Sequence, residues 1–303
     1  MTPQLSIVIV LYNSAESLTQ CLRRVRAAAD SGWAEVIAVD NGSPDDSVEI
    51  VRRELPSARL VALDENRGFA AGANAALALA TGRYWLLLNP DVLIPEGELE
   101  TLVAWMDAHR QLGAASPEIY REDGRWESPG RGAPSICRAL LELSRLHRLL
   151  SGRLRGRILR GPYWSGGDQL GTGWVPGTAM IVRPQAARQV GLLSEELFMY
   201  GEDLEWCWRM RQAGWRIGVC AATTFSHGAS SSARRSFGEE GTERRIAAGV
   251  DAACRLMYGR AHARALAALT AAALALEARA PGRDAVNRHE MRGAARTWWR
   301  LAR

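Results

Sequence analysis

The first third of the chain alternates between two patterns of apolar residues. Continuous runs rich in valine, isoleucine and leucine, typical of strands that a sheet buries on both faces, cover residues 5–12, 34–43, 58–64 and 83–94. Segments with apolar residues at helical spacing lie between and after them, at residues 14–28, 43–55, 68–81 and 95–109. Strands that alternate with helices in this way predict βαβ units and a mostly parallel, Rossmann-like sheet flanked by helices.

The alternation ends after about Ser116. Residues 121–135 are rich in glycine, proline and charge, which is typical of irregular structure. Further strands are predicted within residues 171–184 and 215–232, and helices from Thr242 onward, where alanine, leucine and arginine dominate. The pattern therefore predicts an α/β domain over residues 1–235, followed by a helical, arginine-rich extension over residues 236–303.

One apolar stretch, LFMYGEDLEWCWRMRQAGWRI (Leu197–Ile217), contains three acids. Its spacing predicts a half-buried helix that ends near Gly214. The predicted buried stripe of this helix consists of Leu204, Cys207, Trp208 and Arg211. Glu202 and Asp203 then fall at the helix N-terminus, where acids interact favourably with the helix dipole.

Composition narrows the possible chemistry. The chain has 303 residues, of which 47% are hydrophobic, a formal net charge of +5 and no lysine, so all 38 basic residues are arginine. Without lysine there is no P-loop lysine, no Schiff-base lysine and no anchor for pyridoxal phosphate. The five cysteines are scattered, which favours reduced thiols in the cytosol. No stretch approaches the ~20 apolar residues of a membrane span, and the first apolar run is interpreted as a strand rather than a signal peptide.

Polar residues follow the predicted strands at the edge where open α/β sheets bind ligands. These strand ends are Tyr12–Asn13, Asp40–Ser43, Asp64–Phe69 and Asn89–Asp91. Two of these strand ends also have a purely structural interpretation. VDNGS is typical of an Asx-type turn that caps the next helix, and NPD also fits a turn. The oxygens of Asn89 and Asp91 could equally bind a hard cation. For Gly72, helix packing is the favoured interpretation.

The chain resembles glycosyltransferase family 2 in seven segments that occur in the family's order. They are SIVIVLYN, VDNGS, NRGFAAGAN, LLLNPD, WVPGTAMIVRP, FMYGEDLEWCWRMRQAGWRI and SHGASS. The resemblance covers roughly residues 5–232, and the pairing of NPD with FMYGEDLEWCWR is most similar to the bacterial rhamnosyltransferase branch. It implies a GT-A fold, a nucleotide-diphosphate sugar as donor and inversion of the anomeric carbon.

The resemblance also implies roles for individual residues. Val10 and Tyr12 would flank a pyrimidine base, and Asp40 would accept a hydrogen bond from the base N–H. The remaining nucleotide positions would be Gly68, Asn74 and Asn89. Trp174 and Gly177 would line the sugar or acceptor cleft.

The metal and the catalytic base are implied in the same way. Asn89 and Asp91 take the place of the family's Asp-x-Asp, which holds Mg²⁺ or Mn²⁺ on the diphosphate, and His227 would complete the metal shell. The amide of Asn89 in NPD brings no charge, so metal binding would depend more on Asp91 and His227. The alternative for His227 is a loop histidine that is solvated or packed against the sheet. Asp203 matches the general base, with Glu202 in reserve and Glu205 left to a structural or acceptor-side role.

These expectations describe an inverting enzyme that moves a sugar, rhamnose from dTDP-rhamnose, to a glycan or polyprenyl-linked acceptor in cell-envelope polysaccharide synthesis. A UDP-sugar donor stays open, because both bases present the same N–H. The competing functions are a sugar nucleotidyltransferase, an oxidoreductase and a non-catalytic binder of sugar nucleotides or lipids. Nucleotidyltransferases and dinucleotide oxidoreductases need a glycine-rich loop after a strand. The segment at the end of the first strand is YNSAES, which contains no glycine. The processive QxxRW pattern is also missing, so one sugar per acceptor is expected.

The tail has two interpretations. Residues 279–303 carry seven arginines with Trp298 and Trp299, a combination that fits the inner face of an anionic membrane. Alternatively, the tail packs on the domain or on a second subunit as a homodimer contact. No nucleic-acid motif is present and the acids nearly balance the arginines, so nucleic-acid binding is not expected. The expected location is the cytoplasm, peripheral to the membrane if the tail binds it.

Overall fold

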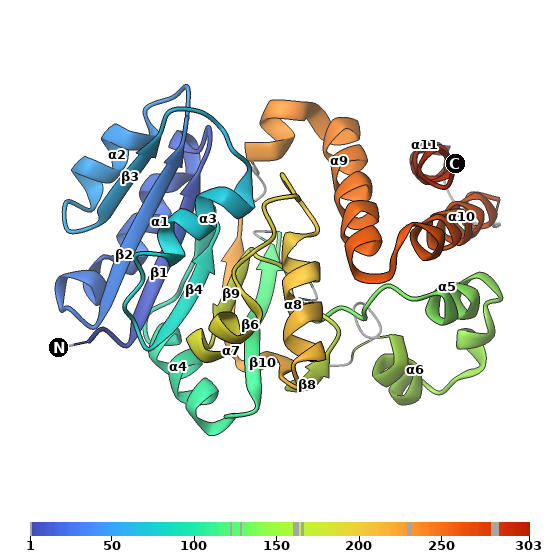
Figure 1. Cartoon of the computed structure of the whole chain (residues 1–303), viewed down its shortest axis with the longest axis horizontal. Helices are drawn as coiled ribbons and strands as arrows, with labels where there is room; N and C mark the ends of the chain where they lie inside the picture. Colours follow the sequence, from blue (N-terminus) through green and yellow to red (C-terminus); the bar gives the residue numbers. More distant parts are fainter. Residues whose placement is uncertain are drawn as a thin grey trace.

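A ten-stranded mixed sheet runs through the computed structural model, which describes residues 2–121, 123–127, 129–159, 164, 167–228, 232–279 and 285–303 (Figure 1). The strands lie in the order β3-β2-β1-β4-β9-β6-β10-β5, with β7 on β6 and β8 on β10. Their bounds are β1 Leu5–Leu11, β2 Ala34–Asn41, β3 Arg59–Leu63, β4 Tyr84–Leu88, β5 Val92–Leu93, β6 Leu112–Arg121, β7 Trp126–Glu127, β8 Gln169–Thr172, β9 Ala179–Val182 and β10 Arg216–His227.

The parallel half of the sheet confirms the predicted βαβ pattern. Strands β1 to β4 are mutually parallel, and the helices α1 (Ala15–Asp30), α2 (Ser47–Glu54) and α3 (Phe69–Leu77) connect them. Every residue of β4 is buried, as expected of an apolar strand in the middle of a sheet. Because β1 and β2 are in register with Leu11 opposite Asp40, their polar ends lie side by side.

The second half of the sheet contains a strand that the sequence did not predict. Residues 112–121 form β6, which pairs parallel with β10 and antiparallel with β9 and β7. Strand β7 lies within residues 121–135, which were predicted to be irregular. The sequence of β6, LGAASPEIYR, has small residues and a proline where a β-branched run would have indicated a strand. Burial between neighbouring strands and helices, rather than local propensity, makes this segment a strand.

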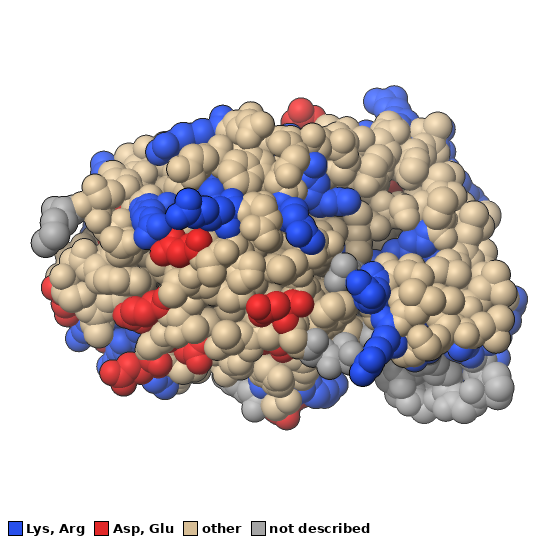
Figure 2. Space-filling view, turned by 90° about the horizontal axis from the view of Figure 1, so that it is seen from below, with Lys and Arg blue, Asp and Glu red and all other residues tan. Residues whose placement is uncertain are grey.

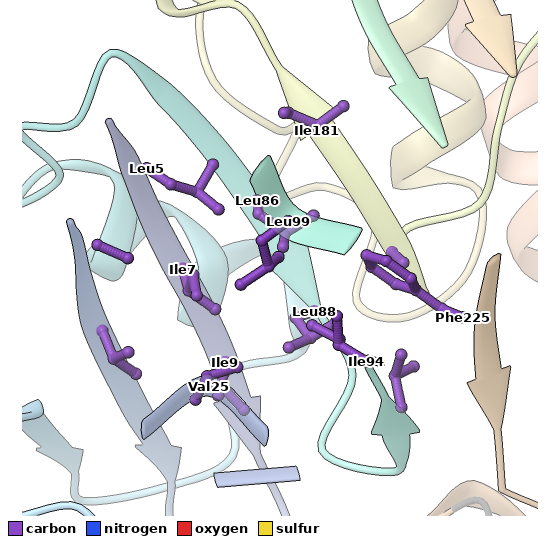
Figure 3. Packing of buried hydrophobic residues seen from close by; sticks show 14 of the residues in the cluster. Leu5, Ile7, Ile9, Val25, Leu86, Leu88, Ile94, Leu99, Ile181 and Phe225 are labelled. Carbon is purple, nitrogen blue, oxygen red and sulfur yellow. The ribbon is translucent and has the colours of Figure 1, made fainter. Parts of the chain in front are cut away.

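Helices cover both faces of the sheet. Residues of α1, α2 and α4 (Glu98–Ala108) pack with Leu5, Ile7 and Ile9 of β1 in one core cluster, which also includes Leu86, Leu88 and Phe225 (Figure 3). Residues of α3, α7 (Pro184–Val190) and α8 (Glu202–Gln212) pack with the alternate residues of the same strands on the other face. Successive strand residues point to opposite faces, so each strand serves both clusters.

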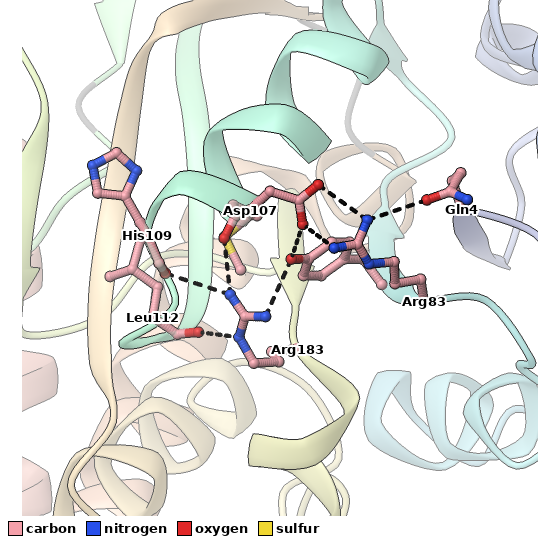
Figure 4. A network of polar contacts seen from close by, with 8 residues as sticks. Gln4, Arg83, Asp107, His109, Leu112 and Arg183 are labelled. Carbon is pink, nitrogen blue, oxygen red and sulfur yellow. Dashed lines mark hydrogen bonds and ion pairs between the residues drawn. The ribbon is translucent and has the colours of Figure 1, made fainter.

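A polar network fastens the amino edge of the central strands (Figure 4). Arg183, directly after β9, donates to Leu112 O at 2.9 Å, to Met106 O at 2.9 Å and to the Tyr84 hydroxyl at 3.1 Å. The Tyr84 hydroxyl donates to Asp107 at 2.8 Å, and Asp107 also pairs with Arg83. Because this network joins β4, β6, β9 and α4 at one edge, the opposite, carboxyl edge is left for a binding site.

Helix α8 confirms the predicted helix between Leu197 and Ile217, but its buried stripe differs from the prediction. The buried apolar residues are Leu204, Trp206, Cys207 and Met210. Trp208 is half-buried and Arg211 is exposed, so the prediction was wrong for these two residues, and it missed Trp206 and Met210. The reason is that α8 packs on the sheet on one side and on α9 on the other, which buries a wider arc than one stripe.

The remaining helices form a second body beside the sheet (Figure 1). They are α5 Ile136–Leu143, the 3₁₀ helix η1 Leu146–Leu149, α6 Gly152–Leu159, α9 Ser232–Tyr258, α10 Arg260–Glu277 and α11 Ala285–Leu301. The three last helices confirm the predicted helical extension, whereas α5 to α6 were not predicted. The predicted domain boundary at 235/236 falls inside α9, near a break at Gly238 (φ 66°), and stays a prediction.

Two glycines bring α9 against the loop that precedes α8. A Cβ on Gly249 would lie 2.2 Å from Tyr200 O, and one on Gly201 would lie 2.4 Å from Gly249 O. Tyr200 and Gly201 both have positive φ, at 69° and 93°. The close approach of these backbones therefore fixes where α9 stands relative to the start of α8.

We expect Gly249→Ala to lower the free energy of unfolding by about 1–3 kcal/mol, because the clash is with backbone atoms that cannot rotate away. Gly293→Ala in α11 is the matched control, since its Cβ would approach only the end of the Arg296 side chain, at 4.0 Å, and alanine favours a helix by up to ~1 kcal/mol. Urea unfolding of both variants checks the prediction. Equal stability of the two variants would show that the α9 contact is not tight.

Candidate active site

A cavity of about 280 Å³ opens at the carboxyl edge of the parallel strands. The ends of β1, β2 and β4 contribute Val10, Tyr12, Asn41 and Asn89 to its lining. The loop before α8 and the first turn of that helix contribute Met199, Tyr200, Gly201, Glu202 and Asp203. Two residues of α9, Ile246 and Val250, complete one wall, so the helical extension takes part in the site.

The β1–β2 end of the cavity has the features expected for a nucleobase. Val10 and Tyr12 line this end. Asp40 is not part of the lining; it lies in the neighbouring strand and is only 4% exposed. One Asp40 oxygen accepts a hydrogen bond from Ser43 N at 3.1 Å. The other, Oδ1, is buried and has no hydrogen-bond partner among the described residues. A buried acceptor without a donor costs free energy, and a base N–H would satisfy it.

Asn41 and Asn66 also line this end, although no motif in the sequence indicated either residue individually. The Asn41 amide donates to Asn66 Oδ1 at 3.1 Å and to Gly68 O at 2.9 Å, while its oxygen accepts from Arg67 N. These bonds hold the 66–68 loop beside the end of β2. The signal was present in the sequence, because both asparagines follow predicted strands, but amides at turns are too common to be assigned.

The structure does not bring Gly68 and Asn74 into the cavity lining. Gly68 has φ 86°, and a Cβ there would lie 2.2 Å from Phe198 O, so it serves a close backbone contact. The Asn74 amide donates to Leu193 O at 2.9 Å and accepts from Leu193 N at 3.1 Å, which fastens α3 to the loop after α7. Their nucleotide roles stay predictions. Gly72 fits its packing interpretation, since a Cβ would lie 2.8 Å from Val10.

At the β4 end, two residues from distant parts of the sequence face each other. Asp91 follows β4, and His227 ends β10; the antiparallel pairing of Val92 with His227 holds them together. Asp91 Oδ1 and His227 Nε2 are 3.4 Å apart. On its other side, His227 Nδ1 contacts Glu127 at 3.2 Å. Burial lowers the pKa of His227, but hydrogen bonding to Asp91 and Glu127 outweighs burial and raises this pKa to about 9.

The Asp91–His227 pair fits a divalent cation. Asp91 Oδ1 and His227 Nε2 are both buried and face each other at 3.4 Å, and neither has another hydrogen-bond partner among the described residues. A carboxylate and an imidazole can share one divalent cation such as Mn²⁺. Within the described ranges, no group of three or more His, Cys, Asp or Glu side chains surrounds a single point. Asn89, which lines the cavity beside Asp91, could add an amide oxygen. A cation here would therefore depend on oxygens from the ligand for the rest of its shell.

Glu127 was missed by the sequence analysis because it lies in the stretch interpreted as irregular. The short strand β7 places Glu127 opposite Ile119 of β6. From there its carboxylate orients the His227 ring, the usual arrangement behind a histidine ligand. Only the alternation of Arg125, Trp126 and Glu127 could have indicated a strand, and two residues are too few for that signal.

Asp203 and Glu202 stand at the start of α8, as predicted. Asp203 accepts hydrogen bonds from Gly177 N at 2.9 Å and from Leu204 N at 2.7 Å. Burial raises the pKa of Asp203 despite these hydrogen bonds. Burial, together with the charge of Asp203, raises the pKa of Glu202 to about 8. At neutral pH Glu202 therefore holds a proton. The two backbone N–H groups that donate to Asp203 favour its carboxylate form, which makes Asp203 the candidate proton acceptor of the pair.

Glu205, one turn further along α8, has a structural role. Both its oxygens bind Arg209, at 2.7 and 2.9 Å. Arg209 in turn donates to the carbonyls of Val190 and Leu192, which closes the end of α7. This ion pair confirms the structural half of the prediction for Glu205.

Trp174 and Gly177 line the same side of the cavity as Asp203. The guanidinium of Arg131 lies 5.2 Å from the centre of the Trp174 ring, and its charge lowers the pKa of Asp203. Arg131 was not singled out from the sequence, where it is one of many arginines in a Gly/Pro-rich loop. Backbone hydrogen bonds between Arg131 and Trp174 bring these two loops together. The result is a cation beside the candidate base.

We expect the free energy of unfolding of the native chain to fall by a few kcal/mol between about pH 5 and about pH 8 on account of Glu202. Its pKa is raised in the folded state, so the stability it contributes is present below its ordinary pKa and is lost as the pH rises through about 8. Glu202→Gln should show a smaller fall in urea unfolding, whereas Glu96→Gln, at an exposed position, should match the native chain. Identical slopes for all three proteins would contradict the burial of a protonated Glu202.

Several known proteins are similar to this chain in sequence. The family model described as Glycosyl transferase family 2 matches residues 6–160. An N-acetylglucosaminyl-diphospho-decaprenol L-rhamnosyltransferase of Mycobacterium tuberculosis is 27% identical over 259 residues, which is 77% of this chain and 79% of that protein. A low-salt glycan biosynthesis hexosyltransferase, Agl10, of Haloferax volcanii is 25% identical over 233 residues, 75% of this chain and 68% of that protein.

Solved structures show the same fold at low sequence identity. A mannosyltransferase of Pyrobaculum calidifontis, in complex with GDP-Man and Mn²⁺, superposes with a TM-score of 0.56 at 18% identity, over 100% of this chain and 84% of that one. GalNAc-T7 with UDP, GalNAc and Mn²⁺ superposes with a TM-score of 0.57 at 15% identity, over 97% and 55% of the two chains. The sheet and its flanking helices form a GT-A fold, and the chain belongs to glycosyl transferase family 2.

Proposed function

We propose that this glycosyltransferase moves rhamnose from dTDP-rhamnose to a hydroxyl of a glycan or polyprenyl-linked acceptor, with inversion, in cell-envelope polysaccharide synthesis. One observation supports the mechanism: a single cavity is lined by the acidic pair on α8 and, beside the end of β4, by Asp91, whose Oδ1 lies 3.4 Å from His227 Nε2. The choice of sugar and acceptor is supported by the mycobacterial relative, which is named a rhamnosyltransferase acting on a diphospho-decaprenol.

The two ends of the cavity would divide the donor between them. The base would lie against Val10 and Tyr12, with its N–H donating to the unpaired Asp40 Oδ1. The diphosphate would then reach Asn89, Asp91 and His227. These residues would hold Mg²⁺ or Mn²⁺, which supplies positive charge to the diphosphate leaving group. The sugar would be left facing Trp174, Gly177 and the start of α8.

Asp203 would act as the general base. Its hydrogen bonds from Gly177 N and Leu204 N hold the carboxylate in one orientation, and burial raises its pKa, which strengthens it as a base. The acceptor hydroxyl would lose its proton to Asp203 as its oxygen forms the bond to the anomeric carbon. The bond to the diphosphate breaks on the opposite side, so the configuration inverts. Protonated Glu202 keeps a second negative charge away from this step.

A thermal-shift screen with dTDP-rhamnose, UDP-sugars and GDP-sugars, each with and without Mn²⁺, tests the donor. A ligand that binds only the folded state raises the melting temperature by mass action. We expect the largest shift with dTDP-rhamnose and Mn²⁺. A larger shift with a UDP-sugar would identify that sugar nucleotide as the donor in place of dTDP-rhamnose. The proposed mechanism would not change, because Asp40 can accept a hydrogen bond from either base.

Turnover separates the enzyme from a non-catalytic binder. Incubation with the best donor, a lipid-linked acceptor and Mn²⁺ should release the nucleoside diphosphate together with a glycosylated lipid. Donor binding without either product would favour a protein that only binds sugar nucleotides. The absence of a carboxylate at Asn89 is the feature that makes this second candidate worth testing.

A further inference from the structure

Half of the large apolar side chains that the described structure exposes lie in one short segment. They are Leu140, Leu146, Leu149, Leu154 and Ile158, with exposed fractions between 47% and 83%. Leu146 and Leu149 are three residues apart in the 3₁₀ helix η1, and Leu154 and Ile158 are four apart in α6, so each pair shares one side of its helix. We call these five residues with α5, η1 and α6 the α5–α6 face. Clustered exposed apolar residues of this kind mark an interaction surface.

The same segment is strongly basic. Residues 138–160 contain seven arginines and one acid, Glu142, whose carboxylate is already paired with Arg138 at 3.0 Å. Arg153 and Arg157 of α6 are exposed, and no carboxylate of the described chain lies within ion-pair distance of either. Figure 2 shows arginines and almost no acidic side chains at the end of the molecule that carries α5 and α6. The partner that this face fits is therefore both apolar and negatively charged.

The C-terminal tail fits such a partner less well. Helix α11 packs against α10 and α9, and Trp298 lines a hollow between α5, α10 and the Trp174 loop. Only Trp299 of the two tryptophans is exposed, at 51%. The packing of Trp298 agrees with the alternative that the tail packs on the domain. Residues 280–284 of the tail lie outside the described residues.

Neighbouring hollows that share lining residues lie between the active site and the α5–α6 face. A hollow of about 440 Å³ shares Arg131, Trp174 and Val250 with the catalytic cavity. A further hollow of about 500 Å³ shares Arg138 and Thr270 with that one and reaches Arg145, Arg148 and Leu276. If the proposed function holds, a lipid-linked acceptor could have its sugar at Asp203 and its lipid end at this face.

We propose that the α5–α6 face docks on an anionic lipid bilayer. Its leucines and Ile158 would enter the interfacial layer of the membrane, and its arginines would contact the acidic headgroups, as in amphipathic helices that lie on a membrane. No described helix has the length and apolar content needed to cross a bilayer, so the docking is on the surface. The proposal needs no particular sugar donor, because the surface lies outside the catalytic cavity.

Co-sedimentation of the full chain with vesicles tests the proposal. Vesicles of phosphatidylcholine with phosphatidylglycerol should bind the chain, and vesicles of phosphatidylcholine alone should bind it far less. The double variant Leu146→Ser/Leu149→Ser should weaken binding about tenfold or more, since two exposed leucines lose their insertion. Arg153→Gln/Arg157→Gln should weaken it roughly fivefold for each arginine, an effect that added salt reduces.

Matched variants show whether this face, the tail or a dimer contact is responsible for binding. Arg24→Gln/Arg59→Gln removes the same charge from exposed positions at the other end of the molecule and should leave binding nearly unchanged. Trp299→Ser tests the tail. The proposal is overturned if Trp299→Ser abolishes binding while the leucine variant binds normally, or if the native chain ignores anionic vesicles. It is also overturned if light scattering shows a dimer that the leucine variant dissociates, because a second copy would then cover the face. The vesicles contain no acceptor, so failure to transfer rhamnose cannot be confused with failure to dock.

Discussion

Asp203→Asn should lower the rate of sugar transfer by about 10³-fold, within the range of ~10²–10⁴ that a well-placed general base contributes. Asparagine keeps the shape of the side chain and can still accept from Gly177 N, but it cannot take a proton from the acceptor hydroxyl. Steady-state transfer assays give the rate. Calorimetric titration with the nucleoside diphosphate and Mn²⁺ should give an unchanged affinity, since the base-binding end of the cavity is untouched.

Glu202→Gln is the matched control for this experiment, because it changes the neighbouring carboxyl of the same helix turn. Glu202 is protonated at neutral pH and accepts no further proton, so we expect this variant to retain most of the activity. The native rate should also fall as the pH drops below the raised pKa of Asp203, since the base is then protonated. Full activity of Asp203→Asn together with an inactive Glu202→Gln would exchange the roles of the two acids.

Asp91→Ala should remove the dependence of transfer on Mn²⁺ and lower the rate by about 10²–10⁴-fold, the equivalent of several kcal/mol of charge stabilisation. Asp91 contributes the only carboxylate of the NPD turn, because Asn89 stands where a first carboxylate would otherwise be. Unlike Asp203→Asn, this variant should also lose the Mn²⁺-dependent part of its nucleotide affinity, which the same calorimetric titration measures.

Glu127→Gln should weaken metal binding less than Asp91→Ala does. Glu127 contacts His227 on the side away from Asp91, so its loss should weaken metal binding about 10–100-fold, the effect usual for a residue that orients a ligand. Full activity of native enzyme in excess chelator would show that the cation is unnecessary and that Asp91 acts through hydrogen bonds alone.

The sequence predicted some parts of the site much better than others. Tyr12, Asp40 and Asp91 stand at or just after the ends of apolar strands whose pattern is clear, and parallel strands place such residues at one edge. Val10 was indicated only by the family resemblance. By contrast, Glu127 and Arg131 lie in a Gly/Pro-rich loop without periodicity, and only pairing with β6 and Trp174 brings them to the site. Local patterns carry no information about such long-range pairing.

Asn74 shows what a motif match leaves open, and its nucleotide role stays a prediction. Family resemblance placed it along the nucleotide, yet in the structure both ends of its amide are engaged by Leu193. A motif preserves the residue type at a position, but the hydrogen bonds of the folded chain decide what the side chain touches. Trp298 is a second example. Its place in a basic, aromatic tail was compatible with a membrane contact, whereas in the structure it packs beside α10.

The sequence by itself determined the βαβ order, the strand ends that carry polar residues and the acids at the start of α8. These features depend on periodicity and on motifs within a few residues, which local physics imposes on any context. Only the tertiary structure decided that His227 faces Asp91, that Arg131 lies over Trp174 and that α9 closes the cavity through Gly249. Those contacts join residues far apart in the chain, and their energy comes from strand pairing and close packing that no short stretch of sequence contains.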